Sequence, residues 1–188
     1  TFAVIAMGKL GGYELNFSSD IDVMFVYSHD GDTDGGVENR QYFAKLCEFI
    51  INGLSEVTVA GYVFRVDARL RPESSVGVIA RSIDSYEAYY EGWGEIWERQ
   101  ALIKARPVAG DLKLGKQFIQ MLQPFVYQRY LDEFSIAEIK LDIRQTKARI
   151  ERRISEKASV HTHVKLGIGG IRDVEFIIQC LQLIHGGP

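Results

Sequence analysis

The sequence has 188 residues, of which 46% are hydrophobic and 25% are charged, with a formal net charge of -3. This composition excludes a disordered, collagen-like or proline-rich chain, and the small net charge excludes a broad basic surface for nucleic acid or anionic membranes. Because no apolar run approaches the roughly 18 residues of a membrane span and no signal peptide opens the chain, we expect a cytoplasmic protein without nucleic-acid or membrane partners.

The first part of the chain has the pattern of two strands. The apolar run of residues 2–7 is too short for a helix and ends in a glycine-bearing turn over residues 8–12. Residues 20–27 then alternate with a period of two, which predicts a second strand. This alternation places Asp20 and Asp22 on one face of that strand and a row of apolar side chains on the other.

A helix and a third strand follow. Apolar residues recur at helical spacing over residues 37–58 and predict a helix that lies across the sheet. Residues 62–71 alternate again, which places Asp67 on one face together with Arg65, Arg69 and Arg71. Because a strand, helix, strand order favours neighbouring strands in one sheet, we expect the Asp67 face to meet the two aspartates of the second strand.

The remainder of the chain is helical in pattern. Ser135 and Glu138 form a capping box at the start of one of these helices, and a glycine turn at residues 167–170 precedes the last. The predicted helices cover residues 82–104, 114–130, 135–154 and 172–184. His161 and His163 have no further Cys or His near them in sequence, so we interpret them as a surface pair and not as a metal site.

These elements predict an α+β protein: a small mixed sheet flanked by helices, followed by a packed helical region. We place the boundary after the break near Pro107 and Gly110, which gives domains of residues 1–108 and 109–188. The chain opens on Thr1, without an initiator methionine, and runs straight into a strand, so we interpret it as an excised piece.

The acidic residues suggest a metal site. Side chains at i and i+2 of a strand point the same way, and three convergent carboxylates repel one another unless divalent cations lie between them. Asp20, Asp22 and Asp67 therefore fit a two-metal site for phosphoryl transfer. The alternative is that they form the solvated face of a half-exposed sheet, although aspartate is depleted in strands.

Glycines and arginines near these carboxylates suggest an anion site. Gly11 and Gly12 can bring backbone N–H groups close to an anion, and Ser19 adds a hydroxyl. The segment matches neither a P-loop nor a dinucleotide fingerprint, and a plain turn is an equal alternative. The guanidinium groups of Arg69 and Arg71 suit phosphate oxygens, while the alternative pairs these arginines with the aspartates.

Four segments resemble known families. The glycine pair, the Asp-x-Asp strand and VDARLRP (residues 66–72) resemble the polymerase-beta type nucleotidyltransferases. More closely, GKLGGYELNFSSDID (residues 8–22) is similar to the glutamine synthetase adenylyltransferase/adenylyl-removing enzyme family, whose much longer chain carries two such domains. With KARPVAGD (residues 104–111) and GGIRDVEF (residues 169–176), the chain resembles the N-terminal, adenylyl-removing half. We therefore expect the nucleotidyltransferase domain to be truncated at its N-terminus and the helical region to continue further.

The resemblance implies two sets of site residues. The catalytic and metal-binding set is Asp20, Asp22 and Asp67. The set that holds the transferred or attacking phosphate is Gly11, Gly12 and Ser19. The implied cofactor is Mg²⁺ or Mn²⁺, and the implied partners are glutamine synthetase, the PII signal protein, ADP or ATP, and phosphate.

We therefore expect an enzyme that regulates nitrogen assimilation by removing AMP from an adenylylated tyrosine of glutamine synthetase, with orthophosphate as the attacking group and ADP as the product. One alternative is ATP-dependent adenylylation of glutamine synthetase, which shares the same site chemistry. The other is a regulatory or docking module that binds a partner without turnover. The three aspartates argue against such a module, because a site that no longer catalyses a reaction has no physical reason to keep convergent negative charge.

Overall fold

The computed structural model describes residues 1–128, 130–155, 165 and 169–186, and these contain a five-stranded sheet and seven helices. The predicted α+β class is confirmed. The chain divides into two compact units, Thr1–Gly94 with Lys104–Gln123, and Glu95–Ile103 with Pro124–Pro188. This division differs from the boundary predicted at residue 108, because the segment after it returns to the sheet of the first unit. The histidine pair and residues 167–168 of the glycine turn lie outside the described residues.

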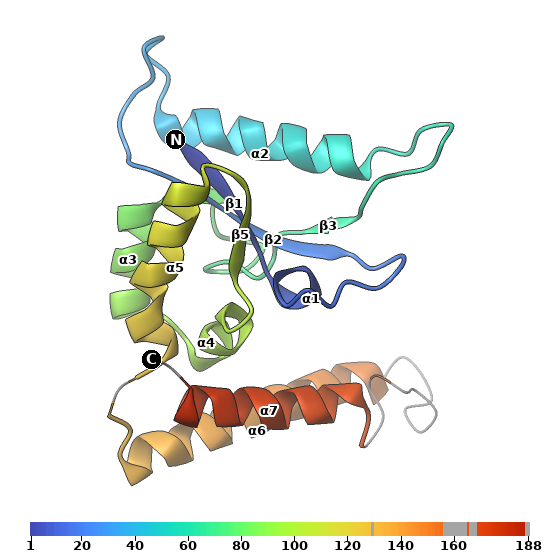
Figure 1. The fold of residues 1–188 in the computed structure, drawn as a ribbon, viewed down its shortest axis with the longest axis vertical. Coiled ribbons are helices and arrows are strands. Elements are labelled where there is room, and N and C mark those ends of the chain that lie inside the picture. Colours follow the sequence, from blue (N-terminus) through green and yellow to red (C-terminus); the bar gives the residue numbers. More distant parts are fainter. Residues whose placement is uncertain (129, 156–164, 166–168, 187–188) are drawn as a thin grey trace. The chain divides into compact units, whose positions relative to one another are not determined.

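The sheet of the first unit has the strand order β3-β2-β1-β5, and β4 also pairs with β2 (Figure 1). The strands are β1 (Phe2–Ala6), β2 (Ile21–Tyr27), β3 (Val66–Asp67), β4 (Ala80–Ser82) and β5 (Arg106–Gly110). The central strands β1 and β2 are antiparallel, and β5 is antiparallel to β1. Both β3 and β4 run parallel to β2. Because β1 occupies one edge of β2, they share the other edge, with β3 at the beginning of β2 and β4 at its end.

Helices cover both faces of this sheet. The first unit contains α1 (Gly8–Gly11), α2 (Asn39–Ser55), α3 (Ile83–Gly92) and most of α5 (Leu112–Val126). Cys47 of α2 packs with the alternate apolar residues of β2, as the period of two predicts. On the opposite face, α5 approaches the sheet at Gly115, where a Cβ atom would lie 3.6 Å from Ile5. Because Ile5 is paired with Met24, that face is also the face of Asp22.

The second unit is helical and contains α4 (Ile96–Leu102), α6 (Glu133–Ser155) and α7 (Ile171–His185). The predicted helix over residues 82–104 is two helices, because a capping box between Glu95 and Glu98 starts α4. The capping box predicted at Ser135 is wrong: α6 begins two residues earlier, and Asp132 Oδ1 accepts the backbone N–H of Ser135 at 2.8 Å. No helix in the described parts of the chain combines the length and apolarity needed to cross a membrane.

Candidate active site

Two of the predicted site aspartates lie side by side on neighbouring strands. In the parallel pairing of β2 with β3, Asp22 is opposite Asp67 and Ile21 is opposite Val66. Residues at the same register of a parallel pair point to the same face of the sheet. The two carboxylates therefore share the face predicted from the alternation, although the sheet contact that joins them is only two residues long.

The third strand is much shorter than the predicted 62–71 because Asp67 itself ends it. Its Oδ1 accepts the backbone N–H of Arg69 at 2.9 Å, which closes a turn two residues on. At the other end, the backbone N–H groups of residues 63 and 64 donate to the carbonyl oxygen of Leu54 at the end of α2. The period-two alternation therefore stops at Asp67 and does not extend to the arginines beyond it.

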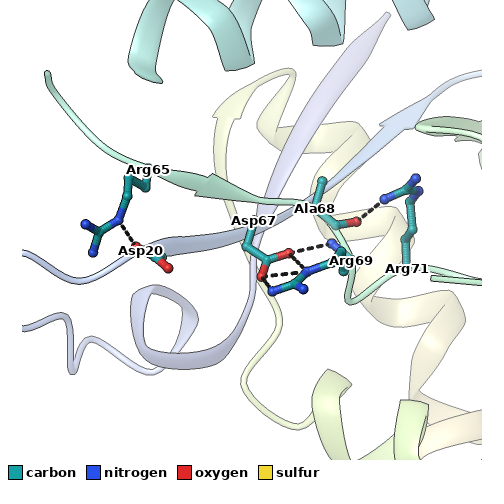
Figure 2. Close-up of polar contacts among 6 residues, drawn as sticks. All are labelled: Asp20, Arg65, Asp67, Ala68, Arg69 and Arg71. Atoms are coloured by element: carbon teal, nitrogen blue, oxygen red, sulfur yellow. Dashed lines mark hydrogen bonds and ion pairs between the residues drawn. The ribbon is translucent and has the colours of Figure 1, made fainter. Parts of the chain in front are cut away.

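Two of the three aspartates, Asp20 and Asp67, are each paired with an arginine (Figure 2). Arg69 Nε lies 3.0 Å from both carboxylate oxygens of Asp67, and its Nη2 lies 2.5 Å from Oδ2. Arg65 donates from Nε to Asp20 and from Nη2 to the carbonyl oxygen of Ser18 at 3.1 Å. The alternative in which arginines pair with the aspartates therefore describes Arg65 and Arg69 in this structure.

The pKa values of these groups follow the pairing. The hydrogen bond from Arg69 holds the pKa of Asp67 below its usual range, against the opposing effect of partial burial. The same bond raises the pKa of Arg69, and the bond to Asp20 raises the pKa of Arg65. Asp67, Arg65 and Arg69 are therefore charged at neutral pH.

Asp22 is positioned by a glycine at the start of α1. Gly8 has a φ of +50°, and a Cβ atom at this position would lie 2.6 Å from Oδ2 of Asp22. The backbone N–H of Met7 also donates to the carbonyl oxygen of Asp22 at 2.8 Å. The backbone at Gly8 therefore lies close to the Asp22 carboxylate, with no room for a side chain between them.

The predicted phosphate-binding glycines are placed differently. The N–H groups of Gly11 and Gly12 donate to the carbonyl oxygens of Met7 and Gly8, so they are engaged within α1 and its end. A Cβ atom at Gly11 would lie 2.0 Å from the carbonyl oxygen of Lys104, so this glycine allows two backbones to touch. Ser19 is partly buried and lies directly before Asp20.

Arg71 lies apart from the carboxylates, beyond Ala68 in Figure 2. It is only 8% exposed, and its guanidinium donates to the carbonyl oxygens of Ala68, Gly77 and Val78. Burial lowers its pKa. The prediction that Arg71 faces the carboxylates and holds phosphate is at odds with this placement: β3 ends at Asp67, and the Arg71 guanidinium is buried and holds the following loop.

The loop beside α1 is held by Arg106 and Lys104. Arg106 donates to the carbonyl oxygens of Leu10 and Gly11 at 2.9 and 3.1 Å, and its guanidinium lies 3.7 Å from the ring centroid of Tyr13. Lys104 pairs with Glu14 at 2.6 Å. Both belong to the KARPVAGD segment, whose resemblance marked it as important but whose spacing could not show its contact with a loop about 90 residues earlier.

The acidic group suits a hard divalent cation in its donor chemistry. Carboxylate oxygens are the ligands that Mg²⁺ and Mn²⁺ prefer, and Asp22 and Asp67 are adjacent in register. Across the residues that the structure describes, however, no three acidic, His or Cys side chains lie close enough together to hold one ion. The carboxylates of Asp20 and Asp67 instead contact Arg65 and Arg69.

In the second unit, polar contacts join α7 to α4 and α6. Gln100 Nε2 donates to Gln179 Oε1 at 2.6 Å, and Lys147 of α6 pairs with Asp173 of α7 at 3.1 Å. These contacts join helices within the unit. Gln179 therefore packs against another helix of its own unit.

Comparisons with known proteins agree with these features. Residues 1–121 match the family model described as glutamate-ammonia ligase adenylyltransferase, and residues 137–187 match that of GlnD PII-uridylyltransferase. The bifunctional glutamine synthetase adenylyltransferase/adenylyl-removing enzymes of Pseudomonas syringae pv. tomato and Thioalkalivibrio sulfidiphilus are 49% and 50% identical to this chain over 187 and 186 residues. The corresponding enzyme of Methylococcus capsulatus is 46% identical over 189 residues.

These alignments cover 98 to 100% of this chain but only 18 to 19% of each relative, so the chain spans about a fifth of their length. The first family model covers the whole sheet and its aspartates. The alignments with the relatives also extend through the second unit. The chain therefore belongs to the glutamate-ammonia ligase adenylyltransferase family.

Proposed function

We propose that this chain carries a nucleotidyltransferase site that removes AMP from an adenylylated tyrosine of glutamine synthetase by phosphorolysis. The register of β2 and β3 carries the proposal, because it sets Asp22 beside Asp67 with Asp20 two residues away. The names of the relatives supply the protein substrate and the two directions of transfer. The proposal includes the PII signal protein as a regulatory partner, and phosphate with ADP or ATP as the small molecules.

In the proposed reaction, an oxygen of orthophosphate bonds to the phosphorus of AMP while the bond from that phosphorus to the tyrosine oxygen breaks. The products are ADP and tyrosine. The electron pair of the broken bond stays on the phenolic oxygen, which is a tolerable leaving group with a pKa of about 10 and takes its proton from solvent. Little acid catalysis is therefore needed.

The residues of this chain would hold and orient the reacting groups. Asp20, Asp22 and Asp67 would ligate Mg²⁺ or Mn²⁺, which when bound stabilises charge on the attacking and leaving oxygens. Ser19 and Arg69 lie next to these carboxylates in sequence or in contact with them, and they would donate to phosphate oxygens. Gly8 would keep the Asp22 carboxylate in place.

The test is phosphorolysis of adenylylated glutamine synthetase, followed as ADP formed from orthophosphate. Asp22→Asn preserves the shape of the side chain but removes its charge, so we expect turnover to fall about a thousandfold or more. Asp34→Asn removes a charge from an exposed loop of the same unit and is the matched control. Near-full activity of Asp22→Asn would contradict the proposal.

The reverse reaction is the second candidate, because the relatives are named for both activities. With ATP and unmodified glutamine synthetase, an adenylylating site releases pyrophosphate and transfers AMP to the tyrosine. Product analysis with phosphate or ATP separates the two directions. Turnover in neither direction, together with unchanged binding of glutamine synthetase by Asp22→Asn, would instead indicate a docking module.

A further inference from the structure

We propose that Arg65 and Arg69 are exchangeable counter-ions of this site: each holds one carboxylate until a divalent cation takes that carboxylate, and the freed guanidinium then contacts phosphate. This inference rests on the proposed function, because it assumes that the carboxylates ligate a cation. It adds an order of events in which cation binding prepares the phosphate contact.

The first argument is that the arginine and the cation need the same atoms. Arg69 places Nε at 3.0 Å from each oxygen of Asp67 and Nη2 at 2.5 Å from Oδ2, so both carboxylate oxygens are already engaged. A cation needs those oxygens at about 2.0 to 2.6 Å. Each carboxylate oxygen has about two acceptor sites, and Oδ1 also accepts the backbone N–H of Arg69 at 2.9 Å. All acceptor sites of Asp67 are therefore in use, and an ion must displace at least one side-chain contact of Arg69.

The second argument concerns which partner is able to move. The Asp67 side chain is 20% exposed and also accepts the backbone N–H of its own turn, whereas the Arg69 side chain is 72% exposed. Arg65 is likewise exposed, at 58%. A long exposed side chain can swing into solvent at little cost, so in this pair the Arg69 guanidinium leaves while the Asp67 carboxylate stays in place. Asp20 is itself 53% exposed, so in its pair with Arg65 either side chain is able to move.

The third argument is the contrast with the neighbouring Arg71. That guanidinium is buried and donates to three backbone carbonyl oxygens, so it belongs to the fold and has no reason to move. Three arginines thus lie within seven residues, two exposed on carboxylates and one buried on backbone. Only the exposed pair has the partners and the freedom that exchange requires.

The ion pairs of Arg65 with Asp20 and of Arg69 with Asp67 are weak enough for a cation to replace the arginines. Exposed ion pairs change an equilibrium by about fivefold at most. An ion held by two or more carboxylates is bound more strongly than a single exposed guanidinium. The arginines would therefore weaken cation binding only modestly, while they relieve the repulsion between carboxylates in the absence of the cation.

The direct measurement is the ¹H–¹⁵N spectrum of the arginine side chains during a titration with Mg²⁺. We expect the Nε–Hε signals of Arg65 and Arg69 to shift with Mg²⁺ saturation and the signal of Arg71 to stay fixed. In the Mg²⁺-bound protein, addition of inorganic phosphate shifts the Arg69 signal again. Signals of Arg65 and Arg69 that stay fixed while Mg²⁺ binds would overturn the inference.

Calorimetry of variants gives a second readout. Arg69→Gln removes the competitor, so we expect it to bind Mg²⁺ about three- to fivefold more tightly than the wild type and to bind inorganic phosphate more weakly. Arg40→Gln removes an equal charge from an exposed position at the start of α2 and is expected to leave both affinities unchanged. An Arg69→Gln variant that binds Mg²⁺ no better than the wild type would contradict exchange.

The two proposals fail differently. Absence of Mg²⁺ and Mn²⁺ binding to the wild-type protein would overturn the metal site of the proposed function, and this inference with it. Binding of Mg²⁺ with unmoved arginines would overturn this inference alone, and the phosphorolysis assay would still decide the function.

Discussion

Replacement of Gly8 by alanine tests whether this glycine positions the Asp22 carboxylate. The added Cβ atom would lie 2.6 Å from Oδ2 and 3.4 Å from Cγ of Asp22. To restore an ordinary contact of 3.4 Å, the carboxylate oxygen must retreat by about 0.8 Å. Because Gly8 also has a φ of +50°, alanine adds backbone strain of about 1 to 2 kcal/mol.

The consequences differ for stability and for metal binding. We expect Gly8→Ala to lower the free energy of unfolding by about 2 kcal/mol, because an off-rotamer side chain adds about 1 kcal/mol to the backbone strain. A shift of 0.8 Å in a ligand oxygen exceeds what Mg²⁺ tolerates, so we expect affinity for Mg²⁺ to fall about 10- to 100-fold. Urea denaturation and titration calorimetry measure the two quantities.

Gly36→Ala is the matched control. Gly36 has a φ of +73° and no atom within 4 Å of an added Cβ, so alanine there brings the backbone strain without displacing a carboxylate. We expect a similar backbone penalty and unchanged Mg²⁺ affinity. If Gly8→Ala binds Mg²⁺ as well as Gly36→Ala does, Gly8 does not position Asp22 and the reasoning is refuted.

Three further predictions concern stability, each measured by urea denaturation. Gly11→Ala places a Cβ 2.0 Å from a backbone carbonyl oxygen and should cost about 3 kcal/mol. Gly53→Ala, in the last turn of α2 with open space around it, should stabilise by about 0.5 kcal/mol, and equal effects of the two changes would contradict the packing role of Gly11. Arg106→Gln removes the fork that binds two carbonyl oxygens at the end of α1 and should cost about 1 to 2 kcal/mol, and no loss would show that the loop is held by other contacts. The hydrogen bond from Arg69 lowers the pKa of Asp67, so this pair contributes at most about 1 kcal/mol to the free energy of unfolding. The contribution is fully present above the pKa of Asp67 in the unfolded chain, about 3.9, and is lost as the pH falls through the lower pKa of the folded protein. The stability difference between wild type and Arg69→Gln should therefore be constant above about pH 5 and vanish in more acidic solution; a difference that persists there would exclude this pairing as its source.

Local pattern was sufficient for much of the fold. Period-two alternation predicted β2 and the sides of its residues, because a strand with one face under a helix must present apolar residues at every second position. Helical spacing predicted α2, α5 and α7 to within a few residues. It predicted α3 and α4 as one helix, although Gly92 ends α3 and Gly94 directly precedes the capping box of two glutamates that starts α4.

The strand–helix–strand order predicted that the strand of Asp67 neighbours the strand of Asp22 in one sheet. The structure shows this neighbour relation and adds its parallel direction and its register. The end of β3 did not follow, because it depends on a hydrogen bond from Asp67 to its own turn that competes with continued pairing. That turn also determines the position of Arg71: it was predicted to contact phosphate, and in the structure its buried guanidinium donates to backbone carbonyl oxygens.

The sequence by itself determined the α+β class, the family and the aspartates that share a face, because these depend on residue type, spacing and resemblance. Only the tertiary structure decided which partner each charged or small residue contacts: Arg69 with Asp67, Gly8 with Asp22, and Arg106 with the end of α1. Such contacts join segments up to about 95 residues apart and are chosen by competition among all groups within reach in space. The spacing of residues along the sequence does not show which groups come within reach of one another in space, so it could not predict these contacts.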